Sequence, residues 1–238
     1  MTSYDPIATA YNRYWGPFSK KQFVPILERY LLPHLYVGAR ILDLGCGTGQ
    51  IAAWLSDKGF QVTGIDISAS MIRLARQNAP KAEFVVQDIR ELNLSSTYHA
   101  SISLFATLNH LMSVEELQRV FERVYDRLES RGGFLFDLNT NEGFRKRWEG
   151  TVTVIEDDFV LISQAMYDPE EKVAQTKITS FVLSDKGWER RDTKLVHRPY
   201  EVEEVMSALE NAGFRQIETY QTRYKQGEGR QFFLAWKI

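Results

Sequence analysis

The sequence predicts an α/β protein: a doubly wound, seven-stranded and mostly parallel sheet, interrupted by an antiparallel, β-rich insertion. Two observations predict this fold class. From residue 40 to residue 139, short apolar runs alternate with segments of helical period, and strands that alternate with helices form parallel sheets covered on both faces. After residue 139, apolar and polar residues alternate with a period of two, which is typical of antiparallel strands.

The first forty residues are expected to be helical, because apolar residues between Phe23 and Leu31 recur at helical spacing before Pro33 ends the run. Buried strands are then expected where short runs rich in β-branched and aromatic residues end at turn signals. These runs occupy residues 40–44, 61–66, 83–88, 99–105 and 132–139, and two final ones lie at 215–220 and 230–238.

The intervening helices carry capping signals. Gly59 closes the first, Ser68 is placed to cap the second, and Gly213 follows the last as a C′ residue. Ser113 and Glu116 have the spacing of a capping box before a strongly amphipathic stripe. We therefore expect helices at residues 50–59, 68–79, 113–128 and 200–214.

The insertion is expected to form three or four antiparallel strands within residues 145–198. Its period-two segments are "TVTVIED", "FVLISQAMYD", "KVAQTKITSFVL" and "GWERRDTKLVH", separated by Asp, Pro, Gly or Lys turns. The chain is thus divided into one α/β domain, residues 1–144 and 199–238, and the insertion. A turn is also expected at Gly227 and Gly229.

Composition narrows the function classes. With 238 residues, 44% of them apolar, the chain can bury a sizeable core, and a net charge of −2 provides no field for nucleic acid or an anionic membrane. A lone cysteine, Cys46, excludes an intrachain disulfide and a Cys-rich metal site, and no metal is expected. No signal peptide and no run approaching ~20 apolar residues is found, so a cytoplasmic location is expected. A monomer or homodimer is also expected.

A glycine-rich turn follows the first strand, in "ILDLGCGTGQ". Gly45, Gly47 and Gly49 allow a ligand to lie against the backbone and permit positive φ angles where the chain turns sharply. The G-x-G-x-G spacing differs from the G-x-G-x-x-G of dinucleotide-binding turns, and no Lys-Ser/Thr pair follows as in a phosphate loop. The turn therefore predicts a ligand without a pyrophosphate.

Three acidic residues lie at the ends of three successive strands. Asp43 suits a ligand with an ammonium group, Asp66 can accept hydrogen bonds from ribose hydroxyls, and Asp88 can accept one from the exocyclic amine of adenine. S-adenosylmethionine has these three parts. Capping of a helix N-terminus is the alternative interpretation of Asp66 and Asp88.

The motifs "LDLGCGTG", "GIDIS" and "FVVQDIR", in this order and spacing, resemble those of the class I S-adenosylmethionine-dependent methyltransferases. The resemblance covers residues 4–139 and resumes from residue 200 to the end. It implies a Rossmann-like cofactor-binding domain, in which Gly45 and Gly47 contact the methionine moiety, Asp66 the ribose and Asp88 the adenine. The other residues implied at the cofactor are Tyr11, Asp43, Gly49 and Phe105, with Ile67, Met71 and Ile89 around the base; core packing is the alternative for the apolar ones.

Within that class, the segments "YDPIATAYNRYW", "LFATLNHLMSVEEL" and "GGFLFDLN" resemble the small-molecule branch, including the amino-sugar N-methyltransferases of antibiotic pathways. The resemblance implies transfer of a methyl group to nitrogen or oxygen of a small molecule. It also implies an N-terminal lid, in which Tyr11, Tyr14 and Trp15 exclude water and attract the sulfonium group. A surface helix held to the core by its aromatic residues is the alternative.

The acceptor is expected between the fourth strand and the insertion. His110 is a candidate base, or else a hydrogen-bonded structural residue, and Tyr14 is assigned with it as catalytic. Asn109 and Trp148 are candidate substrate contacts, and Arg198 could hold a carboxylate or phosphate or form an ion pair instead. Further candidates from this region are Tyr167, Arg191, His197 and Tyr200.

Three other interpretations are open. A nicotinamide-dependent oxidoreductase would place its third glycine one position after Gly49 and would have no use for Asp43 or Asp88. A tRNA or rRNA methyltransferase needs a basic surface, for which "FRKRW" is the local signal. A non-catalytic relative would bind S-adenosylmethionine without turnover, because cofactor residues predict binding alone.

Overall fold

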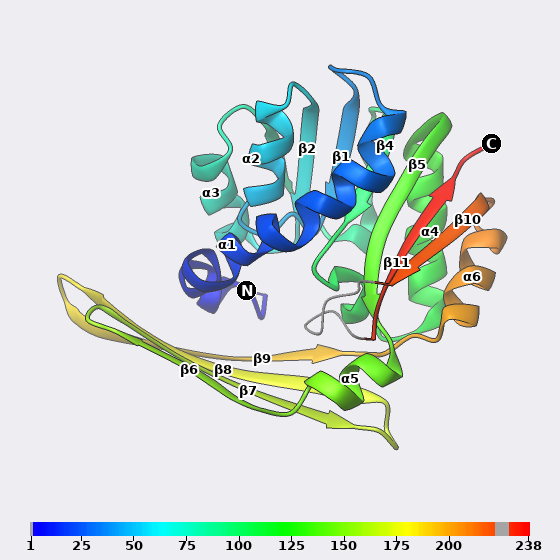
Figure 1. Cartoon of the computed structure of the whole chain (residues 1–238). Coiled ribbons are helices and arrows are strands. Elements are labelled where there is room, and N and C mark those ends of the chain that lie inside the picture. Colours follow the sequence, from blue (N-terminus) through cyan, green and yellow to red (C-terminus); the bar gives the residue numbers. More distant parts are fainter. Residues whose placement is uncertain (1, 222–228) are drawn as a thin grey trace.

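A computed structural model describes residues 2–221 and 229–238. Its centre is a seven-stranded sheet of order β10-β11-β5-β4-β1-β2-β3, shown in Figure 1. Strands β1 to β5 pair in parallel, whereas β11 runs antiparallel to both neighbours, so the predicted fold class is confirmed. The strands are β1 Arg40–Leu44, β2 Gln61–Asp66, β3 Glu83–Val86, β4 Tyr98–Ser103, β5 Leu128–Asn139, β10 Arg215–Gln221 and β11 Arg230–Trp236.

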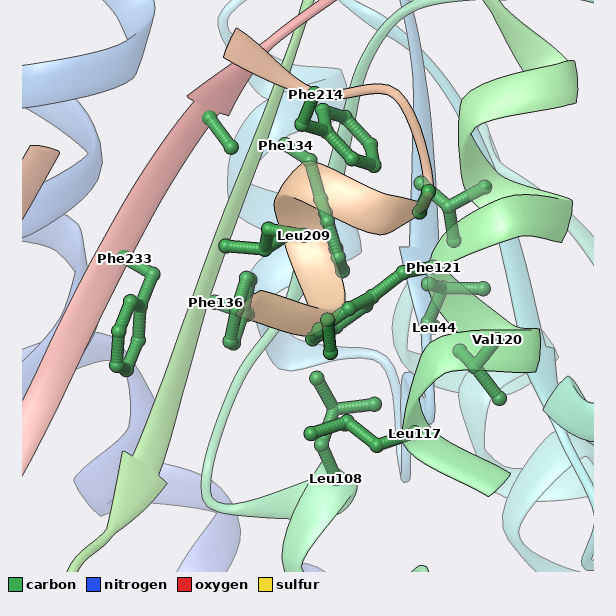
Figure 2. Close-up of a cluster of buried hydrophobic side chains, with 14 of the residues drawn as sticks. Leu44, Leu108, Leu117, Val120, Phe121, Phe134, Phe136, Leu209, Phe214 and Phe233 are labelled. Carbon is green, nitrogen blue, oxygen red and sulfur yellow. The ribbon is translucent and has the colours of Figure 1, made fainter. Parts of the chain in front are cut away.

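Helices cover both faces of this sheet. Apolar residues of α1, α2 and α3 form one buried cluster with β1, β2 and β4, and those of α4 and α6 form another with β1 and β5. Figure 2 shows Phe121 of α4 and Leu209 of α6 against Phe134 and Phe136 of β5. The helices are α1 Ala8–Ile26, α2 Gln50–Asp57, α3 Ala69–Asn78, α4 Val114–Arg127 and α6 Val202–Asn211.

Short helical turns connect these elements. An N-terminal turn, η1, precedes α1, and the π-turn η2 and the 3₁₀ turn η3 follow it before β1. Two more 3₁₀ turns, η4 and η5, follow β3 and β4 at the edge of the sheet where the site lies. Their bounds are η1 Asp5–Ile7, η2 Leu27–Leu31, η3 Leu32–His34, η4 Ile89–Glu91 and η5 Thr107–His110.

Three of the four predicted caps are present, including Gly59, which follows α2 with a φ of +92°, and one differs. The Ser68 hydroxyl accepts the N–H of Met71 at 3.1 Å, and Gly213 has a φ of +103° after α6. Ser113 accepts the N–H of Glu116 at 3.1 Å, but the Glu116 carboxylate accepts the N–H of Met112 rather than that of Ser113. The expected capping box is therefore only half formed, because the glutamate reaches one residue further back.

The insertion forms a four-stranded antiparallel sheet of order β6-β7-β8-β9, as predicted. In Figure 1 it lies as a long curved layer below the N-terminal end of α1. A short helix, α5 Asn141–Arg147, precedes it and was not predicted, and the expected domain boundary at 144/145 falls inside this helix. The strands are β6 Gly150–Glu156, β7 Phe159–Asp168, β8 Val173–Ser184 and β9 Gly187–His197.

Two glycines bring α5 against the start of β11. Gly229 has a φ of +75°, and a Cβ atom on Gly229 or Gly143 would overlap the backbone of the other residue. Of the turn expected at Gly227 and Gly229, Gly227 lies outside the described residues. Within residues 2–221 and 229–238, no helix is long and apolar enough to cross a membrane.

Candidate active site

Two neighbouring cavities lie where the parallel strands end. The larger, of about 530 Å³, lies beside the turn after β1 and the end of β2, and we call it the glycine-turn cavity. The smaller, of about 190 Å³, lies between the N-terminal helix, the end of β5 and the insertion sheet, and we call it the insertion cavity. Tyr4, Tyr11 and Phe105 line both, so these three aromatic side chains are the boundary that the cavities share.

Most of the predicted cofactor residues are brought together in the glycine-turn cavity. They come from the N-terminal helix and from the segments that follow four strands, which meet at one edge because the strands are parallel. The predicted residues that line this cavity are Tyr11, Gly45, Gly47, Asp66, Ile67, Met71, Asp88, Ile89 and Phe105.

Two predicted residues lie outside its wall. Asp43 is 3% exposed and borders a separate space of about 30 Å³ behind Gly45. Gly49 lines neither cavity; it has a φ of +81° at the start of α2, and a Cβ there would lie 3.0 Å from Cα and Cβ of Ala75 in α3. Gly49 therefore permits the close approach of two helices rather than the approach of a ligand.

Asp66 is the best-placed acceptor in the glycine-turn cavity. Its two carboxylate oxygens accept the N–H groups of Ser68 at 2.8 Å and Gly47 at 3.0 Å, so the side chain is fixed by both neighbouring turns. Burial nevertheless raises the pKa of Asp66 to about 6. Burial, together with the charge of Asp66, raises the pKa of Asp43 to about 7. A cationic group bound nearby would lower both pKa values.

Asp88 caps a helical turn and also lines the glycine-turn cavity. Its Oδ1 accepts the N–H of Arg90 at the start of η4, and Arg90 Nη2 donates to Oδ2 at 2.7 Å. Burial alone would raise the pKa of Asp88, but the hydrogen bonds and charge of Arg90 outweigh it and the pKa is lowered. Asp88 thus caps a helical turn while its ionised side chain lines the cavity.

His110 forms a half-buried, hydrogen-bonded pair with Tyr4. His110 Nδ1 lies 2.9 Å from the carbonyl oxygen of Val196, and a carbonyl can only accept, so Nδ1 carries the proton. In the neutral ring Nε2 is then the acceptor, and it takes the Tyr4 hydroxyl proton at 2.8 Å. Burial lowers the pKa of His110 to about 4, which keeps the ring neutral, and burial also raises the pKa of Tyr4 well above its usual value.

Tyr4 was not singled out from the sequence, because no local pattern connects residue 4 with residue 110. Its position is set by Asp5, whose Oδ1 accepts hydrogen bonds from the Ser68 hydroxyl at 2.6 Å and from Ser70 N–H at 3.1 Å. These bonds attach the N-terminal segment to the start of α3, beside the cavity. Burial opposes ionisation of Asp5, but hydrogen bonds from Ser68 and Thr2 lower its pKa to about 2.

The structure places Tyr14 away from both cavities. Tyr14 packs against Trp15 and Phe18 and joins the apolar cluster between α1 and the insertion sheet. Trp15 lines the insertion cavity, and Tyr11 lines both. The geometry therefore does not support the catalytic role expected for Tyr14, whose ring packs toward the insertion sheet and lines neither cavity.

Asn109 and Arg198 also lie outside both cavities. Asn109 is fully buried, and its amide bonds Asn139 N–H and the carbonyls of Asn139 and Arg198 at 2.6–3.0 Å. Arg198 forms an ion pair with Glu204 at 3.0 Å and lies over the Tyr200 ring. The Asn109 side chain thus holds backbone segments together, and Arg198 forms the ion pair that was the alternative for it.

The remaining candidates from this part of the chain fall into two groups, one that lines the insertion cavity and one that lines neither cavity. Trp148 and His197 line the insertion cavity, where Trp148 Nε1 donates to the Thr176 hydroxyl at 3.1 Å. Tyr167, Arg191 and Tyr200 line neither cavity. Their partners are the Asn141 side chain, the Glu189 carboxylate and the Leu111 carbonyl, respectively.

A strained turn follows β4 at the boundary between the cavities. Phe105 and Ala106 have φ angles of +66° and +59°, a conformation that costs about 1–2 kcal/mol for residues with a Cβ atom. Ala106 N–H donates at 3.0 Å to Asp137, a fully buried carboxylate near the end of β5. Asp137, Asn139, Arg147 and Arg230 were not predicted as site residues, although all lie at the ends of strands or beside them.

Comparisons with known proteins identify the family of this chain. The methyltransferase domain model matches residues 41–132. YqeM of Bacillus subtilis, which is named as a methyltransferase, is 31% identical to this chain over 181 residues. The match spans 74% of this chain and 73% of that protein. This chain belongs to the S-adenosylmethionine-dependent methyltransferases.

Solved methyltransferase structures share the whole fold. An S-adenosylmethionine-dependent methyltransferase from Clostridium acetobutylicum superposes with a TM-score of 0.81 at 20% identity, covering 99% of both chains. CalS10, an amino pentose methyltransferase from Micromonospora echinaspora solved with S-adenosylmethionine bound, gives a TM-score of 0.71 at 21% identity and covers 100% of this chain.

S-adenosylmethionine is accordingly the cofactor of this methyltransferase, and the glycine-turn cavity fits it. A volume of about 530 Å³ lies within the range of roughly 300–1,000 Å³ typical of cofactor sites. Side-chain-free backbone at Gly45 and Gly47, an acceptor at Asp66 and an apolar slot beside Asp88 match the polar and flat parts of that molecule.

Proposed function

We propose that this protein transfers the methyl group of S-adenosylmethionine to nitrogen or oxygen of a small molecule that binds in the insertion cavity. The observation that carries the proposal is the boundary shared by the two cavities: Tyr4, Tyr11 and Phe105 line both. A methyl donor on one side and an acceptor on the other would meet at this boundary. Alignment of two bound reactants supplies most of the acceleration of such a displacement.

The relatives support a small acceptor. A dTDP-3-amino-3,6-dideoxy-α-D-glucopyranose N,N-dimethyltransferase from Streptomyces fradiae is 33% identical over 90 residues. The basic run at Arg145, Lys146 and Arg147 belongs to α5, where the three side chains contact Asn141, Glu142 and Asn139, respectively. Because these contacts neutralise or fix the three basic side chains, we do not interpret them as a binding site for nucleic acid.

The cofactor supplies the activated methyl group, and the chain's residues supply position and proton acceptance. Asp66 and Asp88 would hold the ribose and the base, and Gly45 and Gly47 the methionine arm. The bound cofactor would supply its sulfonium methyl group to the acceptor's nitrogen or oxygen, with S-adenosylhomocysteine as the leaving group. If the acceptor arrives protonated, its proton passes to the Tyr4 oxygen as the Tyr4 proton passes to His110 Nε2.

The domain division is part of the same proposal. The cofactor binds the Rossmann-like domain of residues 1–144 and 199–238, and the insertion of residues 145–198 covers the acceptor. The protein acts in the cytoplasm as a monomer or homodimer, and neither a membrane nor a nucleic acid is its partner.

Turnover is tested with the purified chain, S-adenosylmethionine and a panel of small amines and hydroxylated compounds. Formation of S-adenosylhomocysteine that depends on the added compound, with the methylated product seen by mass spectrometry, is the expected result. A chain that binds S-adenosylhomocysteine but releases none across the panel would favour the non-catalytic interpretation. Methylation of bulk tRNA alone would overturn the small-molecule acceptor.

A further inference from the structure

Unpaired polar groups gather on the wall of the insertion cavity. Arg230 is 7% exposed, and its Nε and Nη1 are buried without a hydrogen bond in the described part of the chain. Asn139 Nδ2 and His197 Nδ1 on the same wall also have no hydrogen-bond partner there. Buried polar groups are nearly always paired, so these atoms indicate a ligand that the cavity is built to receive.

The charge on this wall is positive. Among the described residues that line the cavity, Arg147 and Arg230 are the only charged side chains, and none of these residues carries a carboxylate. Asp137 lies behind Arg230 with Oδ2 3.5 Å from Nε, which is longer than an ordinary hydrogen bond to a charged group. Asp137 also accepts Ala106 N–H, so it balances Arg230 in part without using its donors.

The guanidinium group of Arg230 is also held in place by aromatic rings. Its Cζ lies 5.5 Å from the ring centre of Phe23 and 5.7 Å from that of Phe105. A planar, always charged fork fixed in this way matches a carboxylate, which can accept two parallel hydrogen bonds from it. Arg198, which the sequence offered for this role, is paired with Glu204 and lines neither cavity.

The size and walls of the cavity limit the ligand. A cavity of about 190 Å³ is slightly larger than an apolar cavity of about 150 Å³ that admits one benzene molecule. Aromatic side chains of Tyr11, Trp15 and Trp148 and apolar ones of Ile178 and Leu195 form its walls. This space suits a single ring with one or two small substituents.

We infer that the methyl acceptor is a ring-sized carboxylic acid, held with its carboxylate on Arg230 and its nucleophilic nitrogen or oxygen toward Tyr4. The inference rests on the proposed function and names the substrate class of the same site. Because Arg230 and Tyr4 line the same small cavity, one ring can reach both. The carboxylate takes no part in the bonds that form and break; it fixes the ring.

The test is calorimetric titration of the full chain with S-adenosylhomocysteine bound. The probes are 4-hydroxybenzoate and 4-aminobenzoate, each compared with its uncharged amide. We expect at least one acid to bind, and to bind at least tenfold more tightly than its amide. Equal affinities for acids and amides, or no binding of either acid, would overturn the inference. Preference for benzyl phosphate over both acids would overturn the carboxylate assignment.

Variants separate the role of Arg230 from folding. Arg230→Lys keeps the charge beside Asp137 but removes the fork, and Arg230→Gln removes both; each should lose most of the preference for acid over amide. Arg191→Gln, on the exposed surface of β9, is the matched control and should keep it. Retained S-adenosylhomocysteine binding and an unchanged melting temperature show that each variant is correctly folded. If Arg230→Lys folds and keeps the full preference, the assignment is wrong.

The two proposals fail differently. Loss of the acid preference with methylation of a neutral amine intact would overturn only the carboxylate inference. Tight binding of an acid without release of S-adenosylhomocysteine from any panel compound would instead overturn the proposed function.

Discussion

The Asp66 carboxylate lies between two turns at the edge of the glycine-turn cavity. Its oxygens accept the N–H groups of Gly47 and Ser68 and still line the cavity. We expect Asp66→Ala to weaken S-adenosylhomocysteine binding by about 2 kcal/mol or more, because hydrogen bonds from ribose hydroxyls to a charged acceptor are lost. Isothermal titration calorimetry measures the change. An unchanged dissociation constant would remove Asp66 from the ribose assignment.

Cofactor binding is expected to depend on pH through the same residue. Burial raises the pKa of Asp66 to about 6, and only the ionised carboxylate accepts from both hydroxyls. Lowering the pH through 6 should therefore weaken S-adenosylhomocysteine binding, by about tenfold for each pH unit below that pKa. Asp66→Asn should lose this component of the pH dependence. An affinity that is constant from pH 7.5 to 5 would contradict the prediction.

Tyr4 and Tyr14 provide a matched pair for the chemical step. Tyr4→Phe removes the hydroxyl that donates to His110 Nε2, whereas Tyr14→Phe changes a ring that lines neither cavity. We expect Tyr4→Phe to lower kcat by roughly 10²-fold with little change in cofactor affinity, and Tyr14→Phe to change neither. His110→Gln should resemble Tyr4→Phe. Steady-state kinetics with an acceptor from the panel distinguishes these outcomes.

Among the secondary-structure elements, the glycine-rich turn has two different tasks. Gly47 lines the cavity with a φ of +54°, whereas Gly49 lies where α2 approaches α3. Alanine at either position strains the backbone by about 1–2 kcal/mol. Gly49→Ala should lower the melting temperature while the folded protein keeps its affinity for S-adenosylhomocysteine, and Gly47→Ala should weaken that affinity. Equal effects of both changes on affinity would contradict the division.

Most element boundaries could be predicted from local patterns, and the exceptions have local reasons. Helix α5 was missed because it is short and contains Gly143, a poor helix former that is needed for the contact with Gly229. Its start is stabilised by Thr140, whose hydroxyl accepts Gly143 N–H at 3.3 Å. Strand β5 begins at Leu128, earlier than residue 132, because α4 passes into it without a loop.

At the scale of the whole molecule, the insertion sheet is attached to the N-terminal helix by one apolar cluster. Leu161 of β7 is fully buried there with Ile7 and Ala10, whereas Ile155 of β6 is 77% exposed. We expect Leu161→Ala to lower the free energy of unfolding by about 2–5 kcal/mol and Ile155→Ala by less than ~0.5 kcal/mol. Chemical denaturation measures both. Similar small effects would show that the sheet is not held against the helix.

The sequence alone predicted the strands and most of the helices in their order, and it placed Gly45, Gly47 and Asp66 together at one edge of the sheet. It could do so because hydrophobic period, caps and turn residues act over a few positions. Only the tertiary structure decided that Tyr4 pairs with His110, 106 residues away, and that Arg230 rather than Arg198 lines the second cavity. These assignments depend on which side chains are brought together when the sheet, the N-terminal helix and the insertion pack. Local sequence patterns contain no information about such long-range contacts.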